Sequence, residues 1–321
     1  MQFNPKPPLW ARTPPAIFPP ILGLLGIGLA WRTAAKSLNA PEWIGEMLLG
    51  AVGLLFVFAL LAYASKVARR PSVILDDLKI LPGRAGIAAA SLALMLFAAA
   101  LIPVAPQIAH VAFGAAVITH SLLAILMIYV LLSGPKEQRT VTPIWHLSFV
   151  GFIVLPLAGL PLGYVEGARL IFWGTMPIAA VIWGISLVQF IRNRAPEPLR
   201  PLFAIHLSPL SLFAIVAAGL GYQQIAIGFA VAAVIALAAL LIAVRWLTIS
   251  GFSAMWGAFT FPMAAFCNAM LAVEPFGPHL FGLLGRVGLA FASIAVIWIA
   301  VKIMQAWTKG KLAVATNAAQ A

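Results

Sequence analysis

Charged residues are scarce in this chain. Asp, Glu, Lys and Arg make up 9% of its 321 residues and hydrophobic residues make up 63%, whereas a soluble globular protein carries about 25% charged residues. So few charges cannot cover a water-facing surface, which excludes a cytosolic enzyme, a secreted domain and a disordered chain. Cysteine is nearly absent as well, and because Cys267 is alone, an intrachain disulfide is excluded. The composition therefore predicts an integral membrane protein.

Ten apolar stretches are long enough to cross a bilayer, which takes about 20 apolar residues in a helix. Each is bounded by charges or by clusters of proline and glycine, and none shows the alternating pattern of an outer-membrane barrel. The sequence therefore predicts an all-α integral membrane protein with ten transmembrane helices. The predicted spans are residues 16–34, 43–65, 85–102, 108–132, 144–162, 168–191, 202–220, 224–247, 252–273 and 280–306.

These spans divide the chain into three parts. Residues 1–15 are expected to form a cytoplasmic N-terminal segment, and residues 16–306 a membrane domain with a pore. Residues 307–321 are small and polar, so we expect a disordered cytoplasmic tail.

The net charge of +12 bears on how the chain is oriented. Cytoplasmic loops of membrane proteins carry an excess of Lys and Arg. If the N-terminus is cytoplasmic, the outer segments keep only Arg32, Lys36, Arg169 and Arg286, whereas the acidic residues divide evenly between the two sides. Both termini are therefore predicted to be cytoplasmic. The basic residues on the cytoplasmic side would be Lys6, Arg12, Lys66, Arg69, Arg70, Lys79, Arg84, Lys136, Arg139, Arg192, Arg194, Arg200, Arg245, Lys302, Lys309 and Lys311.

Prolines separate the odd-numbered spans from the even-numbered ones. They occur in the first span (Pro19, Pro20), the fifth (Pro156), the seventh (Pro209) and the ninth (Pro262). A proline leaves a backbone carbonyl unpaired, which hydrocarbon tolerates only where protein or water supplies a partner. The odd spans are therefore expected to face inward. The short outer connections predict that each odd span pairs with the following even span as a hairpin, giving five hairpins.

Two short motifs carry a resemblance to a known family. The tripeptide HLS occurs at residues 146–148 and again at residues 206–208, and the ninth span contains Trp256 followed by Thr260, Phe261, Pro262 and Met263. The first segment, HLSFVG, and the second, W…TFPM, resemble segments of plant slow-type guard-cell anion channels. The wider resemblance is to the tellurite-resistance and dicarboxylate transporter family, which includes bacterial TehA-type members.

The resemblance implies the architecture and the site. It implies ten helices as five hairpins in a ring around a central pore, lined by the odd helices and closed by a phenylalanine. It further implies a homotrimer with one pore in each subunit, located in the bacterial plasma membrane, with small inorganic or organic anions as the permeating species. The family's gating phenylalanine matches Phe261.

A phenylalanine gate also has a physical basis. An aromatic ring in a narrow apolar conduit expels water, and a dewetted constriction blocks ions without using charge. The alternatives are that Phe261 only packs between helices, or that Phe259, two residues earlier on another face, is the gate.

No Asp or Glu lies in the middle of any predicted span. Proton- or sodium-driven carriers usually keep such a carboxylate as their coupling group, so its absence favours a passive conduit. Hydroxyls could supply weak donors, although each could instead bond to its own helix backbone, and the two HLS histidines could tune ion access or simply be satisfied at helix ends. For the third span, Ser91 is a guess. The expected lining residues are Pro20, Ser91, His146, Ser148, His206, Ser208, Pro209, Thr260 and Pro262.

Three functions remain open at this stage. The first is passive conduction of small anions through a pore closed by Phe261. The second is a carrier of the same fold for tellurite-related oxyanions, sulfite or C4-dicarboxylates. The third is an intramembrane enzyme, for which Asp76 and Asp77 are the only adjacent acidic pair, and we expect both to be solvated. The cluster of Lys66, Arg69 and Arg70 is expected to face lipid head groups. No metal, cofactor or nucleic-acid partner is expected, because no metal-ligand spacing occurs.

Overall fold

The computed structural model describes residues 8–38, 40–192 and 195–321. Lys6 and Arg194, two of the predicted cytoplasmic cations, lie outside the described residues. So do residues 1–7 of the predicted N-terminal segment. All regular structure within the described ranges is helical. The prediction of an all-α protein is confirmed.

Nine of the ten predicted spans form helices that are long and apolar enough to cross a membrane. Apolar runs of this length satisfy their backbone groups internally when helical, as hydrocarbon requires. In three of them a short 3₁₀ turn precedes the α-helix. The nine are η1 (Pro15–Ile17) with α1 (Phe18–Leu38), α2 (Glu42–Arg69), α4 (Leu81–Leu101), α5 (Pro106–Ser133), α7 (Val165–Arg192), η5 (Glu197–His206) with α8 (Leu207–Gly219), α9 (Gln223–Ile242), η6 (Ala254–Trp256) with α11 (Gly257–Val273), and α12 (His279–Thr308).

The fifth span is shorter and broken, so the prediction of a continuous helix over residues 144–162 is wrong. It consists of a π-helical turn η3 (His146–Val150), a 3₁₀ turn η4 (Gly151–Val154) and the short α6 (Pro156–Gly159). Pro156 has no backbone N–H to donate to the carbonyl of Phe152. Leu155 donates to that carbonyl instead, at 3.0 Å, in a tighter turn. The proline thus explains the change of helical pitch in this segment.

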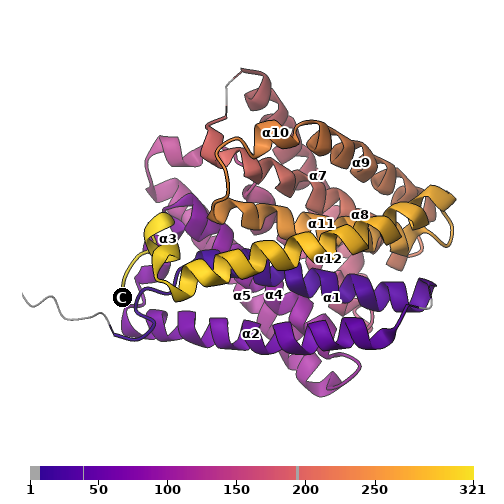
Figure 1. Ribbon diagram of the computed structural model, residues 1–321, viewed down its shortest axis with the longest axis horizontal. Coiled ribbons are helices and arrows are strands. Elements are labelled where there is room, and N and C mark those ends of the chain that lie inside the picture. The colour runs from indigo at the N-terminus through magenta and orange to yellow at the C-terminus, as the bar shows by residue number, and fades with distance from the viewer. Residues whose placement is uncertain (1–7, 39, 193–194) are drawn as a thin grey trace, which may run out of the picture.

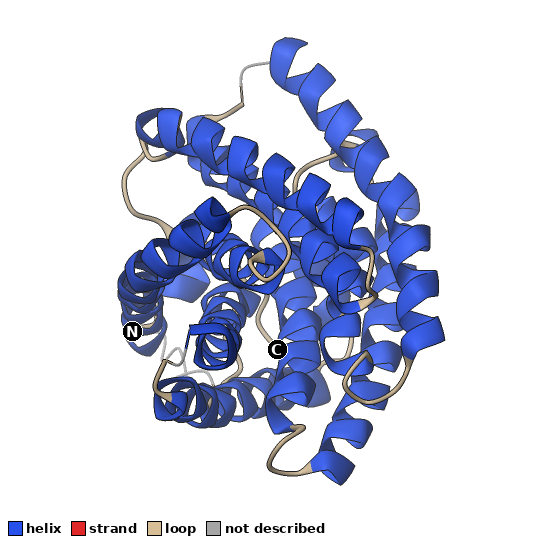
Figure 2. Ribbon diagram, turned by 90° about the vertical axis from the view of Figure 1, so that its right-hand side faces the viewer, coloured by secondary structure: helices blue, strands red, loops and turns tan. Residues whose placement is uncertain are grey.

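The odd segments form an inner ring. Neighbours around it are in contact: α1 with α4, α4 with α6, α8 with η4 and α11, and α11 with α1. In the most apolar stretch of each long odd segment, 67–78% of the residues are buried, against 17–39% in the even helices. Figure 1 shows α1, α2 and α12 running side by side, and Figure 2 shows the same helices turned by 90°. The even helices therefore form an outer layer, as the hairpin prediction requires.

A glycine allows α1 and α11 to approach closely. A Cβ atom at Gly23 would collide with the Thr260 side chain and would lie 2.8 Å from its backbone carbonyl carbon. The Thr260 hydroxyl, in turn, donates across the contact to the carbonyl of Pro19, at 3.0 Å. Gly23 therefore sets the distance between two helices of the inner ring.

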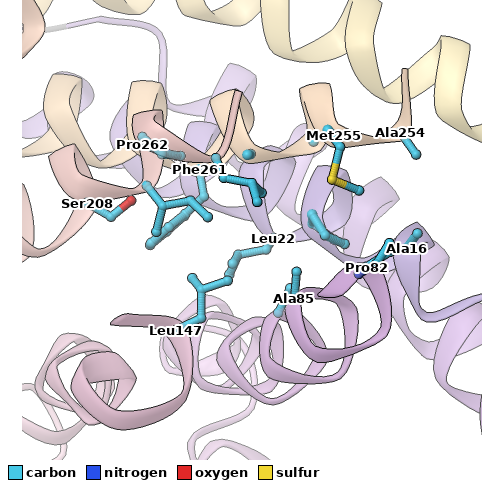
Figure 3. A pocket seen from close by; sticks show the side chains of 16 residues that line it. Ala16, Leu22, Pro82, Ala85, Leu147, Ser208, Ala254, Met255, Phe261 and Pro262 are labelled. Carbon is cyan, nitrogen blue, oxygen red and sulfur yellow. The ribbon is translucent and has the colours of Figure 1, made fainter. Parts of the chain in front are cut away.

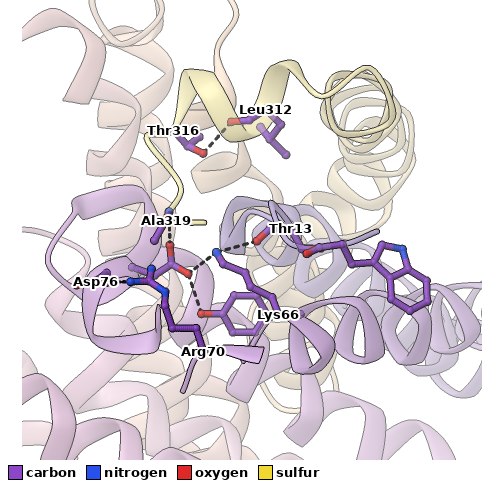
Figure 4. A network of polar contacts seen from close by, with 10 residues as sticks. Thr13, Lys66, Arg70, Asp76, Leu312, Thr316 and Ala319 are labelled. Atoms are coloured by element: carbon purple, nitrogen blue, oxygen red, sulfur yellow. Dashed lines mark hydrogen bonds and ion pairs between the residues drawn. The ribbon is translucent and has the colours of Figure 1, made fainter. Parts of the chain in front are cut away.

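The two ends of the described chain meet at one face, beside α3 (Val73–Leu78) (Figure 1). There the Lys66 Nζ atom lies 2.8 Å from Asp77 Oδ2, and both side chains are fully buried. The Ala319 N–H donates to Asp77 Oδ1 at 2.9 Å (Figure 4). The expectations that Asp77 is solvated and that Lys66 faces lipid head groups are wrong, because the two side chains are paired with each other inside the protein.

The tail also differs from its prediction. Instead of being disordered, residues 311–315 form the helix α13 (Lys311–Ala315), and Leu312 and Thr316 are buried. Beyond the helix, Gln320 Oε1 accepts a hydrogen bond from Arg12, and the Ala321 N–H donates to the carbonyl of Ala11. The tail is held because its backbone donors find acceptors on α3 and on the N-terminal segment.

Candidate functional site: a closed conduit through the inner ring

A row of cavities follows the inside of the ring. The first, the inner cavity, has a volume of about 40 Å³ and is lined by the first residues of the odd segments. Every odd segment contributes to it, and almost all of its lining is apolar (Figure 3). Its lining residues are Ala16, Pro19, Leu22, Pro82, Ala85, Ala89, Leu147, Leu202, Ile205, Ser208, Ala254, Met255, Gly257, Ala258, Phe261 and Pro262.

The outer vestibule is the wide cavity at the opposite end of the ring, with a volume of about 560 Å³. It is lined mainly by the last residues of the odd segments, among them Lys36, Ala99, Gly219 and Ala272. A conduit from the inner cavity to this vestibule would cross the protein along the axis of the ring.

Phe261 interrupts that conduit. Its side chain borders the inner cavity and two small voids, each of about 10 Å³. We call them the inner void, which also borders His146 and Ser208, and the outer void, which also borders Leu29 and Asn268. A single water needs about 10–15 Å³, so neither void can pass a hydrated anion. The Phe261 ring therefore has cavities on both sides, and the voids next to it have room for about one water. We call the two voids and the ring between them the constriction.

The ring of Phe261 is held between α1 and the rest of α11. The residue is 5% exposed. Gly26 of α1 faces it, and a Cβ atom there would lie 3.3 Å from Phe261 Cδ2. The absence of a side chain at Gly26 thus makes the space that the ring occupies.

Fixed charge is balanced at the vestibule and absent from the constriction. Arg32 and Lys36 line the vestibule together with Glu42 and Glu46, which gives two charges of each sign. Arg32 is bound to both carboxylate oxygens of Glu46, at 2.7 and 2.8 Å. Among the described residues, no Asp, Glu, Lys or Arg lines the inner cavity or either void. The narrow part of the conduit is therefore uncharged.

Four of the residues expected to line the pore do line these cavities. Pro262 borders the inner cavity, and His146 and Pro209 border the inner void. Ser208 borders both, and its buried hydroxyl has no hydrogen-bond partner within the described part of the chain. Ser208 therefore offers a free donor on the inner side of Phe261.

The other expected hydroxyls are turned elsewhere. Ser91 lies 2.8 Å from His120 Nδ1 on α5 and donates to the carbonyl of Ala88 at 2.9 Å. Thr260 is turned toward α1 and the carbonyl of Gly257. Ser148 is completely buried and borders none of the cavities described above. None of the three borders these cavities, contrary to expectation. Ser91 and Thr260 turn toward nearby carbonyls or a neighbouring helix, as hydroxyls in apolar helices commonly do, whereas the Ser148 hydroxyl is buried with no hydrogen-bond partner in the described part of the chain.

Three further candidate residues, Pro20, His206 and Phe259, lie away from these cavities. The cavity is bordered by Pro19 rather than Pro20. His206 borders none of these cavities, and Phe259 packs against Trp256, with ring centroids 5.6 Å apart, on a different side of α11 from Phe261. In the third span, Ala85 and Ala89 border the inner cavity, and Leu92 and Leu96 border the voids, in place of Ser91.

The two HLS segments meet in space. His146 Nε2 lies 3.0 Å from His206 Nδ1, and the His146 ring also packs against Trp183 of α7. The repeated histidines thus join the fifth and seventh segments just beside the inner void.

Sequence reasoning missed Asn268. This residue borders both the outer void and the outer vestibule. It lies seven residues after Phe261, which is close to two helical turns, and this spacing could have indicated that the two side chains share a face.

A family model described as voltage-dependent anion channel matches residues 12–304. The search of curated proteins found no match.

Proposed function

The chain belongs to the voltage-dependent anion channel family, and from this premise we propose that it conducts small anions passively through a conduit closed by Phe261. Membership of the family supports anion channel or transporter activity in a multi-pass membrane protein rather than enzymatic activity. The gate, the passive mechanism and the residues that line the path are our proposals.

One observation supports the proposal: the Phe261 ring borders the inner cavity and both small voids inside the ring of odd segments. An apolar ring in an uncharged constriction makes hydration of the path unfavourable and blocks ions by dewetting. Rotation or removal of this single side chain would join the cavities on its two sides.

A passive mechanism is supported by the charges. A coupled carrier usually needs a carboxylate inside the membrane that changes protonation or binds a cation. The acids nearest the conduit are Glu42 and Glu46 in the wide vestibule, and Glu46 is bound to Arg32. The alternative, a carrier of oxyanions, sulfite or C4-dicarboxylates, would show saturable flux that does not respond to substitution of Phe261.

The test is Phe261→Ala in purified protein reconstituted in a planar bilayer. Replacing the ring with a methyl group should raise chloride current about tenfold or more, which corresponds to roughly 1.4 kcal/mol of barrier. The matched control is Phe259→Ala, which removes the same ring from the side of α11 that packs on Trp256 and should leave the current at the background level.

Two outcomes would overturn the proposal. If Phe259→Ala conducts and Phe261→Ala does not, the gate is on the other face of α11. If neither variant conducts while the unmodified protein shows saturable oxyanion uptake in liposomes, the protein is a carrier.

We also propose an orientation and an assembly. The excess of Lys and Arg at the face where the chain ends meet supports placing that face in the cytoplasm of a bacterial cell. The resemblance noted above supports a homotrimer with one conduit in each subunit. Its mass in detergent would be three times that of one chain.

A further inference from the structure

Asn268 is the polar side chain at the outer boundary of the constriction. The outer void is otherwise bordered by Gly26, Leu29, Leu96, Leu157, Leu212, Ile215, Phe261, Ala264 and Ala265, which are all apolar. Asn268 also borders the wide vestibule. An ion that moves inward from the vestibule must therefore pass this amide before it reaches the Phe261 ring.

A neighbouring helix fixes the direction of that amide. The Thr33 hydroxyl of α1 has two acceptors within reach, Asn268 Oδ1 at 2.8 Å and the carbonyl of Leu29 in its own helix at 3.2 Å. Its single proton is directed to the nearer one, Asn268 Oδ1. The carbonyl side of the amide is therefore engaged by α1, and Nδ2, which carries two N–H donors, is left on the other side. The side chain borders both the outer void and the vestibule. The side chain is 9% exposed, so these donors can serve only something inside the conduit.

The vestibule provides no net charge to select anions. Its two basic residues are balanced by Glu42 and Glu46, and Arg32 is occupied by Glu46 and by the carbonyls of Ala99 and Ala100. Discrimination between anions and cations at the outer side must then come from neutral donors. A neutral donor stabilises a partly dehydrated anion without binding it so tightly that it cannot leave.

From this geometry, and resting on the proposed function, we propose that Asn268 Nδ2, oriented by Thr33, is the outer anion-binding and selectivity site of the conduit. It takes a small monovalent anion, a halide or a nitrate-like oxyanion, as the anion leaves the vestibule and loses water. Thr33 also borders the vestibule, but its hydroxyl proton is directed to Asn268 or Leu29, so its role in this proposal is to position the amide.

The test uses the Phe261→Ala protein in planar bilayers, so that conduction does not depend on the gate. Asn268→Asp keeps the shape and the acceptor for Thr33 but replaces the N–H donors with a carboxylate oxygen. It should reduce chloride current at least about tenfold, the factor expected for one hydrogen bond to a charged group. Asn268→Leu should lower the chloride-to-potassium permeability ratio, measured from reversal potentials in a salt gradient, by a similar factor.

Thr33→Val provides a second and milder variant. It removes the hydroxyl at constant shape, and with it the bonds to Asn268 and to the carbonyl of Leu29. It should shift the nitrate-to-chloride permeability ratio by about threefold with the current preserved, because the amide is no longer fixed. The matched control is Thr175→Val on α7, where the hydroxyl donates to the carbonyl of Ile171 in its own helix. That variant should leave both permeability ratios unchanged.

The outcomes separate the two proposals. If the Phe261→Ala protein conducts but its permeability ratios and current stay within about twofold in the Asn268 and Thr33 variants, the selectivity site is wrong and the conduit stands. If the Asn268 variants do not fold, an unchanged nitrate-to-chloride ratio in Thr33→Val overturns the site. If the Phe261→Ala protein does not conduct at all, the proposed function itself fails.

Discussion

Lys66 and Asp77 form a buried ion pair, and each also has hydrogen-bond partners elsewhere in the protein. Lys66 Nζ donates to Asp77 at 2.8 Å and to the carbonyl of Thr13 at 3.1 Å. Asp77 also accepts from the Tyr63 hydroxyl at 2.9 Å and from the Ala319 N–H at 2.9 Å. Such a pair stabilises the fold only while it is complete, because removing one partner leaves the other charge buried without compensation.

Lys66→Met should therefore destabilise the protein strongly. The variant keeps most of the side-chain volume but leaves the Asp77 carboxylate without its cation, at a cost of about 3–5 kcal/mol. The measurement is thermal unfolding in detergent. Lys79→Met is the matched control, because its bond to Asp76 is at the surface and exposed pairs contribute about 0–1 kcal/mol.

A double variant separates charge from packing. Lys66→Met combined with Asp77→Asn removes both charges. Tyr63 and Ala319 donate to different oxygens of Asp77, so the single amide oxygen of the double variant serves only one of them. The double variant should recover a large part of the lost stability. If the double variant is as unstable as Lys66→Met alone, packing of the lysine stem and not its charge holds this site.

Individual site residues were predictable only where a motif was sharp. The TFPM segment indicated Phe261, and the structure places that ring on the conduit. The hydroxyls of Ser91 and Thr260 were wrongly expected there, because a sequence does not reveal which carbonyl or histidine a hydroxyl will find. Asn268 was missed although its spacing from Phe261 is visible in the sequence. The direction of its amide depends on the bond from Thr33, and that bond is known only from the structure.

At the scale of helices, close approach in the inner ring depends on small residues. Gly23 has no room for a Cβ atom next to Thr260. In contrast, a Cβ atom at Gly50, on the exposed face of α2, would meet no atom within 4 Å. The two glycines therefore offer a matched pair of substitutions.

Gly23→Ala should push α1 away from α11 and cost about 1–3 kcal/mol, as overpacking does in other cores. Gly50→Ala should leave stability unchanged or slightly higher, because alanine favours the helix. Both are measured as the melting temperature in the same detergent. Equal melting temperatures for the two variants would show that the contact between α1 and α11 can relax without cost.

The long helices were predictable because each contains an apolar run that only a helix can place in hydrocarbon. Prolines predicted the inward position of four odd segments. The third span has no mid-span proline, and the even helix α7 contains Pro177, so the position of α4 did not follow from this pattern. The broken helix of the fifth span was not predictable, because hydropathy reports the length of an apolar run but not which type of helix it forms. Pro156 combined with Gly151, which packs against His120 and Leu92, produces π and 3₁₀ turns that no hydropathy pattern distinguishes from an α-helix.

At the scale of the whole molecule, the tail joins parts that are far apart in the sequence. Residues 316–321 contact α3 through Asp77 and the N-terminal segment through Ala11 and Arg12. Composition predicted disorder here because the tail has little to bury. The structure differs because the Asp77 carboxylate and the carbonyl of Ala11, both in buried residues, accept hydrogen bonds from its N–H groups. Such partners cannot be identified from the tail's own sequence.

Removing residues 316–321 should therefore lower stability through Asp77. The carboxylate loses the Ala319 N–H, and an unmet hydrogen bond to a buried group costs about 1–3 kcal/mol. Gln320→Ala, which removes only an exposed bond to Arg12, is the control and should have little effect on the melting temperature. Because residues that share a partner are not additive, the truncation should cost less in the Asp77→Asn protein than in the unmodified one. An equal loss in both backgrounds would mean that the tail acts by covering surface, and that Asp77 is not what holds it.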